Sequence, residues 1–218
     1  MSLRLVIMQA FILCFSIKTC GKKLNVSCLP SCSCETIKAA GGERIEMDCR
    51  SAKLVRMPAC PMVFEWNDQN RIRQIRLNLS GNRIEHLDLL FLNQWKTLEV
   101  LILSQNRLKS LSKSADKEIS MRRLKVLDLS SNNIQVLHTF ILNGFPSLRT
   151  LNLSHNQIHT ISNGAFLLPA LLELDLSHNQ MTEVGSHLFE TSPQLEIIRF
   201  AHNRISRLLG NALLSIRS

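Results

Sequence analysis

The sequence contains no tyrosine and only two tryptophans, and aromatic residues make up 5% of its 218 positions. So few aromatic rings disfavour a binder of single-stranded nucleic acid, because such proteins stack bases on aromatic side chains. The chain also lacks a long apolar run: after its first residues, nothing reaches the roughly 18 apolar residues that a membrane-spanning helix needs. Charged residues make up 20% and hydrophobic residues 45%, which predicts a folded core and excludes a mainly disordered protein.

Catalytic signatures are missing as well. The chain has no glycine-rich phosphate loop and no HExxH zinc-binding helix. Ser177 and His178 stand near acidic residues, but the same residue types recur in several copies of a repeat, whereas a catalytic triad is a single convergent arrangement. We therefore expect no enzymatic activity, no cofactor and no metal site.

Cysteine is absent after residue 60, and all seven cysteines lie before that point. This crowding predicts a local disulfide module formed in an oxidising compartment. A zinc site is disfavoured because no CxxC pair occurs. Six cysteines allow about 15 pairings, and spacing alone does not select one of them.

The N-terminus has the pattern of a secretory signal peptide. A short basic start is followed by an apolar stretch from Leu5 to Phe15 and by the small residue Ser16. Cleavage after Ser16 leaves six cysteines, and the alternative cleavage after Gly21 leaves five. An even number favours the first, so we expect a signal peptide over residues 1–16 and an extracellular protein.

From residue 74 the sequence repeats itself. In the segment from Leu124 to Ile134, frame positions 1, 4, 6 and 11 are apolar and position 9 is Asn132. The same frame recurs at steps of 24, 26, 24, 23 and 24 residues. Six matches at this spacing predict an α/β leucine-rich-repeat solenoid. The repeats start at Gln74, Leu98, Leu124, Leu148, Leu171 and Leu195.

Within each repeat, positions 4 and 6 alternate as in a short strand, and successive strands are expected to pair in parallel along a concave face. The asparagine at position 9 carries both donors and acceptors, so it can satisfy the backbone where the chain leaves the strand. Apolar rows at positions 14 and 19 are expected to close the core on the convex side, which we expect to consist mostly of loops and short helical turns. The second repeat has two extra residues between Lys109 and Arg123, and we expect this polar stretch to bulge from the convex face.

These motifs resemble the extracellular leucine-rich-repeat family of the 24-residue type seen in Toll-like receptors, Slit-type guidance proteins and vertebrate variable lymphocyte receptors. The segment 161–169, Ile-Ser-Asn-Gly-Ala-Phe-Leu-Leu-Pro, is similar to the convex half-repeat of that class. The segment from Cys28 to Pro58 resembles its cysteine-rich N-terminal cap. The resemblance implies disulfides between Cys28 and Cys34 and between Cys32 and Cys49. Cys60 lies outside the family pattern, and its pairing with Cys20 is a further hypothesis.

The expected organisation is a signal peptide over residues 1–16, a cysteine-rich cap over 17–73 and six repeats over 74–218 without a C-terminal cap. A solenoid without a cap exposes the apolar edge of its last coil. We therefore expect either an artificial end at Ser218 or a last coil that docks against another chain.

The concave face exposes frame positions 2, 3, 5, 7 and 8. Four basic and five acidic residues occupy these positions, although the whole chain carries a net charge of +9. Apolar residues such as Ile75, Val126 and Ile197 lie among the charges, which suits a protein partner better than a phosphate backbone. The candidate binding residues on this face are Arg76, Glu99, Ile102, Lys125, Asp128, Arg149, Glu173, Asp175 and Arg199.

Three sequons for N-glycosylation occur, at Asn25, Asn78 and Asn152. The last two hold frame position 5, on the concave face. Glycans there would obstruct part of the sheet and direct recognition to a flank or to the fifth and sixth coils.

Frame position 8 is histidine in three consecutive repeats, at His155, His178 and His202. Such a ladder could sense endosomal pH or hold a metal ion. However, histidine before the frame asparagine is common in the class that this sequence resembles, and a turn position requires no charge chemistry. We therefore expect the ladder to be structural.

Two hypotheses of function follow. The first is a secreted or ectodomain recognition module that binds an extracellular protein through its repeat surface, in adhesion, guidance or innate recognition. The alternative is a matrix component resembling small leucine-rich proteoglycans, which would contact collagen or anionic glycans through the basic cap and the Lys109 to Lys125 region. Nucleic-acid sensing is disfavoured because the concave face is not basic.

Overall fold

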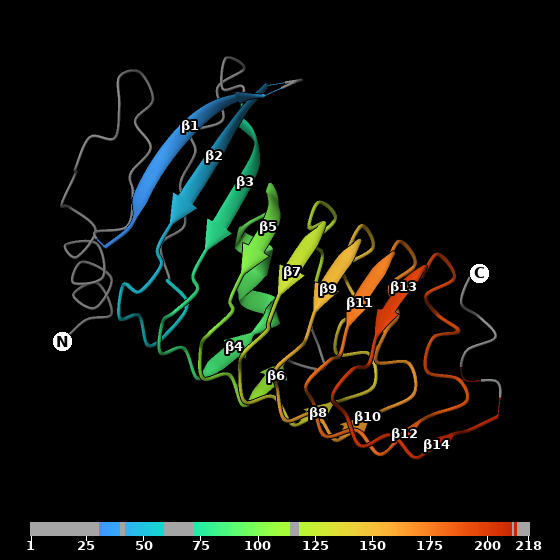
Figure 1. Ribbon diagram of the computed structural model, residues 1–218. Coiled ribbons are helices and arrows are strands. Elements are labelled where there is room, and N and C mark those ends of the chain that lie inside the picture. The colour runs from blue at the N-terminus through green and yellow to red at the C-terminus, as the bar shows by residue number, and fades with distance from the viewer. Residues whose placement is uncertain (1–30, 40–41, 59–71, 114–117, 211, 213–218) are drawn as a thin grey trace, which may run out of the picture.

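The computed structural model describes residues 31–39, 42–58, 72–113, 118–210 and 212. Its main feature is an eight-stranded sheet in the order β1-β2-β3-β5-β7-β9-β11-β13, which runs along one side of a solenoid (Figure 1). β1 and β2 pair antiparallel, and all later neighbours pair in parallel. The strands are β1 Ser33–Ala39, β2 Gly42–Asp48, β3 Ile72–Asn78, β5 Leu98–Ile102, β7 Val126–Asp128, β9 Thr150–Asn152, β11 Glu173–Asp175 and β13 Ile197–Arg199.

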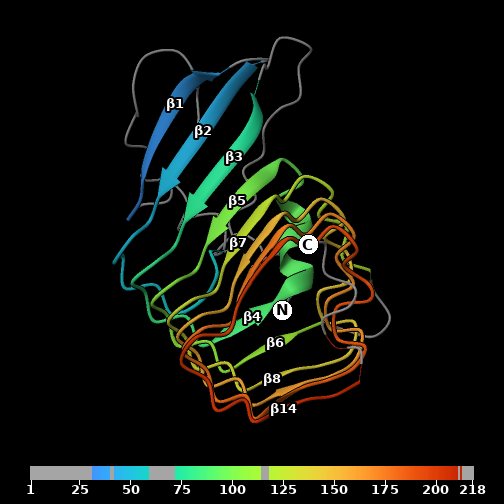
Figure 2. The ribbon, with the colours of Figure 1, turned by 45° about the vertical axis from the view of Figure 1, so that its right-hand side comes forward.

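Short strands lie on another side of the coils and pair in parallel as β4–β6, β8–β10 and β12–β14 (Figure 2). The described part of the chain has one helix, the 3-10 helix η1 over Leu89–Gln94. Its N-cap is Asp88, whose Oδ1 accepts a hydrogen bond from the Leu90 amide at 3.0 Å. The short strands are β4 His86–Asp88, β6 Ser110–Ser112, β8 Val136–Leu137, β10 Thr160–Ile161, β12 Glu183–Val184 and β14 Arg207–Leu208.

The core follows the repeat frame as predicted. Leu127, Leu129 and Ile134 of the third coil are fully buried. On the convex side Phe166 and Phe189 stack with centroids 6.0 Å apart, which extends the core from one coil to the next. Leu208, on the last described coil, is instead 58% exposed. The predicted leucine-rich-repeat solenoid is therefore confirmed, with a parallel sheet on the concave face.

The first coil departs from its expected register. Ile75 was expected to be exposed on the concave face, but it is 2% exposed and pairs with Leu98, the first frame leucine of the next coil. A register shift between Ile75 and Arg76 makes this possible, because an irregularity of one residue changes which face a side chain occupies. Ile75, rather than Gln74, thus supplies the inward apolar side chain.

The stretch between Lys109 and Arg123 is also more ordered than expected. Ile119 and Met121 are buried, and the Met121 amide donates to the Gly144 carbonyl at 2.9 Å. On its other side, Asn93 donates to the Glu118 carbonyl and accepts from the Ser120 amide. The expectation of a polar bulge was therefore wrong for residues 118–121, which are anchored between neighbouring coils.

The cap continues the solenoid. β2 pairs in parallel with β3, so that Met47 lies beside Leu77. Cys32 and Cys49 form a disulfide with an S–S distance of 1.97 Å, the pairing that the resemblance implies. Cys34 is also disulfide-bonded, and its expected partner Cys28 lies outside the described range. The other predictions for the N-terminal region also lie outside it: the signal peptide, Cys20, Asn25, Cys28 and Cys60.

Candidate functional site

The concave face is held in place by a ladder of frame asparagines. The Nδ2 of Asn132 donates to the carbonyls of Leu103 and Leu129, at 3.0 Å each, and its Oδ1 accepts from the Leu108 amide at 3.0 Å. One side chain therefore joins its own coil to the preceding one. The remaining frame asparagines make the same set of contacts: Asn82, Asn106, Asn156, Asn179 and Asn203.

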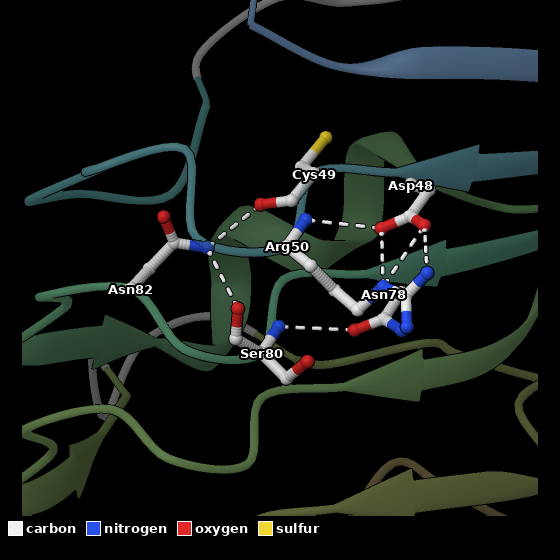
Figure 3. Close-up of polar contacts among 6 residues, drawn as sticks. All are labelled: Asp48, Cys49, Arg50, Asn78, Ser80 and Asn82. Carbon is white, nitrogen blue, oxygen red and sulfur yellow. Dashed lines mark hydrogen bonds and ion pairs between the residues drawn. The ribbon is translucent and has the colours of Figure 1, made fainter.

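Asn82 extends this ladder into the cap. Its Nδ2 donates to the Cys49 carbonyl at 2.9 Å and also to the Ser80 carbonyl (Figure 3). The same figure shows Arg50 paired with both carboxylate oxygens of Asp48. The disulfide-bonded cap and the first coil are thus connected through buried polar contacts as well as through the sheet.

In the third and fifth coils, the acidic residue at frame position 5 closes the strand with a local turn. Asp128 Oδ1 accepts from the Ser130 amide at 2.9 Å, and Asp175 Oδ1 accepts from the Ser177 amide at 2.8 Å. Short polar side chains of this kind favour turns because they bond the backbone two residues on. These two predicted binding residues therefore also have a structural role.

The predicted glycosylation sites take part in the same turns. Asn78 Oδ1 accepts from the Ser80 amide at 3.0 Å. Asn152 Oδ1 accepts from the Ser154 amide at 3.0 Å and from the Ser154 hydroxyl at 2.7 Å. Both asparagines lie on strands of the concave sheet and are half-buried, so a glycan on either would extend over this face.

The nine candidate binding residues lie on or directly before strands β3 to β13 of one sheet. Most of their charges meet a neighbour. Lys125 Nζ lies 3.2 Å from Glu99 Oε1, and Arg199 pairs with Glu173. The side-chain hydrogen bond to Glu173 is the largest cause of a raised pKa of Arg199. The negative charges of Glu173 and Asp175 act in the same direction.

The face continues onto the cap, which the sequence reading missed. Glu46 lies 3.0 Å from Arg44 and 3.9 Å from Arg76. The sequence does contain a sign of this strand: polar and apolar residues alternate from Arg44 to Asp48 with the two-residue period of a strand.

Arg149 differs from the other charged candidates. Arg149 is exposed and lies between Lys125 and Leu172 of the neighbouring coils. Its backbone amide donates to the Lys125 carbonyl, and its backbone carbonyl accepts from the Leu172 amide. Among the described residues, no carboxylate forms an ion pair with Arg149. An unpaired guanidinium in a face of paired charges is available to a ligand.

The three histidines stack. His155 and His178 have ring centroids 4.0 Å apart, and those of His178 and His202 are 4.1 Å apart. All three backbones have positive φ angles of 54° to 56°, a conformation in which histidine is enriched among non-glycine residues. Loss of contact with water, and then the charges of the two neighbouring rings, lower the pKa of His178, while Asp175 opposes this shift.

Metal ligation finds no support in this part of the chain. Across the described ranges, no group of three or more His, Cys, Asp or Glu side chains is placed to hold a metal ion. Within the same ranges no helix combines the length and apolar character needed to cross a bilayer.

The basic region expected between Lys109 and Lys125 is partly compensated by carboxylates. Lys109 lies 3.6 Å from Glu85, and Lys125 pairs with Glu99. Lys113 Nζ donates instead to the neutral Phe140 carbonyl at 2.7 Å, and Arg122 is exposed. Lys117 lies outside the described residues.

Comparison with known proteins supports the repeat architecture. The family model described as leucine rich repeat matches residues 122–181. A search of the curated proteins finds no match.

Two solved structures match part of this chain. The Toll–Spatzle complex from Drosophila matches at 20% identity and a TM-score of 0.51, over 67% of this chain and 24% of that chain. The complex of TLR13 with ssRNA13 matches at 22% identity and a TM-score of 0.40, over 62% of this chain and 26% of that chain. The chain thus spans about a quarter of the length of each of these proteins.

Proposed function

Because this chain is a leucine-rich-repeat protein with a disulfide-bonded N-terminal cap, we propose that it is a non-enzymatic recognition module that binds an extracellular protein through its concave face. The disulfide between Cys32 and Cys49 supports an oxidising, extracellular location. The fold is compatible with a protein partner, since the Toll chain of the similar structure is in a complex with Spatzle.

The observation that carries this proposal is the unpaired Arg149 at the middle of the concave sheet. On one side lies the ion pair of Lys125 with Glu99, and on the other lies that of Arg199 with Glu173. Within each of those two ion pairs the opposite charges already neutralise each other. We therefore expect the pairs to contribute mainly to the shape of the interface and to its selectivity among ligands. Arginine is enriched among the residues that dominate binding energy at protein interfaces.

The partner's chemistry follows from the neighbours of Arg149. Leu172 lies next to it and is half-buried, and Ile197, two coils away from Arg149, is 45% exposed. A partner that places a carboxylate on Arg149 and apolar side chains on these residues would fit this mixture. We therefore propose a protein ligand with an acidic residue beside an apolar patch.

The experiment measures binding of the fluorescently labelled, purified chain to intact cells of its source organism. We expect saturable binding that trypsin treatment of the cells abolishes and that Arg149→Glu weakens about tenfold or more. Arg204→Glu is the matched control, because Arg204 is exposed outside the concave face and forms no ion pair within the described residues. Absence of saturable binding, or equal loss in both variants, would overturn the proposal.

A further inference from the structure

Three basic side chains align on the flank where the chain leaves the concave sheet. Lys53, Arg83 and Arg107 hold the same place in the cap and in the first two coils, directly after frame position 9. The Arg83 amide donates to the Leu54 carbonyl at 2.8 Å, and the Arg107 amide donates to the Ile84 carbonyl at 2.9 Å. These main-chain bonds place each cation beside the preceding coil, at the strand spacing of about 4.8 Å. We call Lys53, Arg83 and Arg107 the basic ladder.

None of the three ladder cations is paired with a carboxylate. All three side chains are exposed, and none forms an ion pair or a side-chain hydrogen bond with another described residue. Like charges at neighbouring positions repel one another, which destabilises the pairing. Lys53 also has a left-handed backbone with φ of 59°, a conformation that glycine or asparagine adopts at lower cost. The fold therefore keeps three aligned cations against both electrostatic and backbone preferences.

The surrounding charges are of both signs: Glu85 and Asp88 line one hollow with Arg83 and Arg56, but neither forms an ion pair with them. Arg56 is exposed near the cap end of the ladder and has no described ionic partner. Glu85 is the acidic residue two positions after Arg83, and it is paired with Lys109 of the next coil. The ladder ends at Asn133, which holds the equivalent place in the third coil. The flank thus has a cationic stripe that runs across the coils, along the axis of the solenoid.

We propose that the basic ladder binds a linear sulfated glycan. The anionic groups of such a chain recur along its length, so one chain can meet all three cations at once. Guanidinium groups bind oxyanions through paired N–H donors. The proposal goes beyond the concave-face function because it uses a different surface. It also gives the expected contact with anionic glycans a site on the flank, apart from the partly compensated stretch from Lys109 to Lys125.

Two other polyanions fit the surface less well. Single-stranded nucleic acid requires exposed aromatic rings for stacking. The aromatic ring of Phe91 lines a hollow with Arg83 but is half-buried against the core, and the exposed apolar residue there is Val55, which is 63% exposed and has no ring. An acidic protein would need an apolar centre to its interface, whereas the ladder consists of cations of a single sign.

The experiment titrates the purified full chain with a size-defined heparin oligosaccharide over a range of salt concentrations. We expect Lys53→Gln/Arg83→Gln/Arg107→Gln to weaken binding at least tenfold and to reduce the salt slope by about three, one for each lost cation. The matched control Lys38→Gln/Lys96→Gln/Arg122→Gln removes the same charge from exposed sites elsewhere and should change affinity less than twofold. The variant Lys53→Arg/Arg83→Lys/Arg107→Lys keeps the charges and should retain most of the binding.

Single-stranded DNA, polyglutamate and desulfated heparin serve as competing probes. Preference for the sulfated oligosaccharide over all three supports the proposal, and equal or tighter binding of another probe overturns it. Equal loss in both triple variants, or no binding by the unaltered chain, also overturns it. If the first triple variant fails to fold, Arg83→Gln alone must lower the salt slope by about one. Because the binding of Arg149→Glu to cells is measured separately, failure here leaves the concave-face proposal standing.

Discussion

The imidazole rings of His155 and His178 lie nearly parallel, with their centroids 4.0 Å apart and an angle of 11° between their planes. His202 stacks on His178 in turn, so that His178 is the central ring of three. A protonated His178 would lose part of its hydration, and any positive charge on His155 or His202 would repel it. This arrangement lowers its pKa below the ordinary value of 6.5, against the opposing effect of Asp175.

The first prediction concerns pH. The folded-state pKa of His178 is below 6.5. As the pH falls below that value, the unfolded chain therefore binds more protons at this residue than the folded chain does. His178 thus lowers the free energy of unfolding in this acidic range. We expect NMR titration to give His178 a midpoint below 6.5. Replacing its neighbour in His155→Gln should raise this midpoint only partly, because loss of hydration is the larger cause. A midpoint at or above 6.5 in the unaltered protein would contradict this account.

The second prediction concerns the cap. Cys32 and Cys49 are 17 residues apart, and closing a loop of this size stabilises a fold by about 3 kcal/mol. We expect Cys32→Ala/Cys49→Ala to lower the free energy of unfolding by about this amount in urea denaturation. Ser33→Ala, at an exposed neighbouring site, should leave it unchanged. A double variant as stable as the unaltered chain would show that the disulfide has no stabilising role.

The repeat frame in the sequence predicts most of the fold. The steps between frame asparagines locate the strands, and the apolar positions such as Leu127 and Leu129 are buried where the frame places them. The nine candidate residues of the concave face also lie along one sheet. These features follow from local periodicity, and each coil repeats the same solution.

Contacts between coils were harder to predict. The burial of Ile75 depends on a register shift against Leu98, and the repeat frame alone does not contain it. The ion pair of Lys125 with Glu99 joins residues 26 apart, so it depends on how successive coils align. The basic ladder was missed for the same reason: Lys53, Arg83 and Arg107 form a set only when the cap is recognised as a coil in register with the repeats.

The third prediction tests the asparagine ladder. Asn132→Ala would leave the buried Leu108 amide without its acceptor. The carbonyls of Leu103 and Leu129 would each lose one donor but would still accept from Asn106 and Asn156. Each buried polar group left unsatisfied costs about 1–3 kcal/mol. We expect chemical denaturation to show a loss of about 1–3 kcal/mol in the free energy of unfolding.

Asn133→Ala is the control for this change, because the neighbouring side chain makes no hydrogen bond with another described residue while its backbone amide still donates to Leu108. The free energy of unfolding of this variant should stay within about 0.5 kcal/mol of that of the unaltered chain. Equal effects of the two substitutions would mean that the buried amide contacts do not stabilise the coil.

The fourth prediction concerns Gly144, which holds the segment around Ile119 against the third coil. Its φ of +113° is unfavourable for other residues, and an added Cβ would lie 2.3 Å from the Ile119 carbonyl oxygen. Because that oxygen belongs to the backbone, Gly144→Ala must displace the buried Ile119, and we expect it to destabilise the protein by about 3 kcal/mol in chemical denaturation. In Gly185→Ala, the nearest atom to the new Cβ would be Asn163 Oδ1, at 3.6 Å, so the free energy of unfolding should be unchanged or rise by about 0.5 kcal/mol. If Gly144→Ala proved as stable as Gly185→Ala, the close approach of Gly144 to Ile119 could not be what anchors residues 118–121.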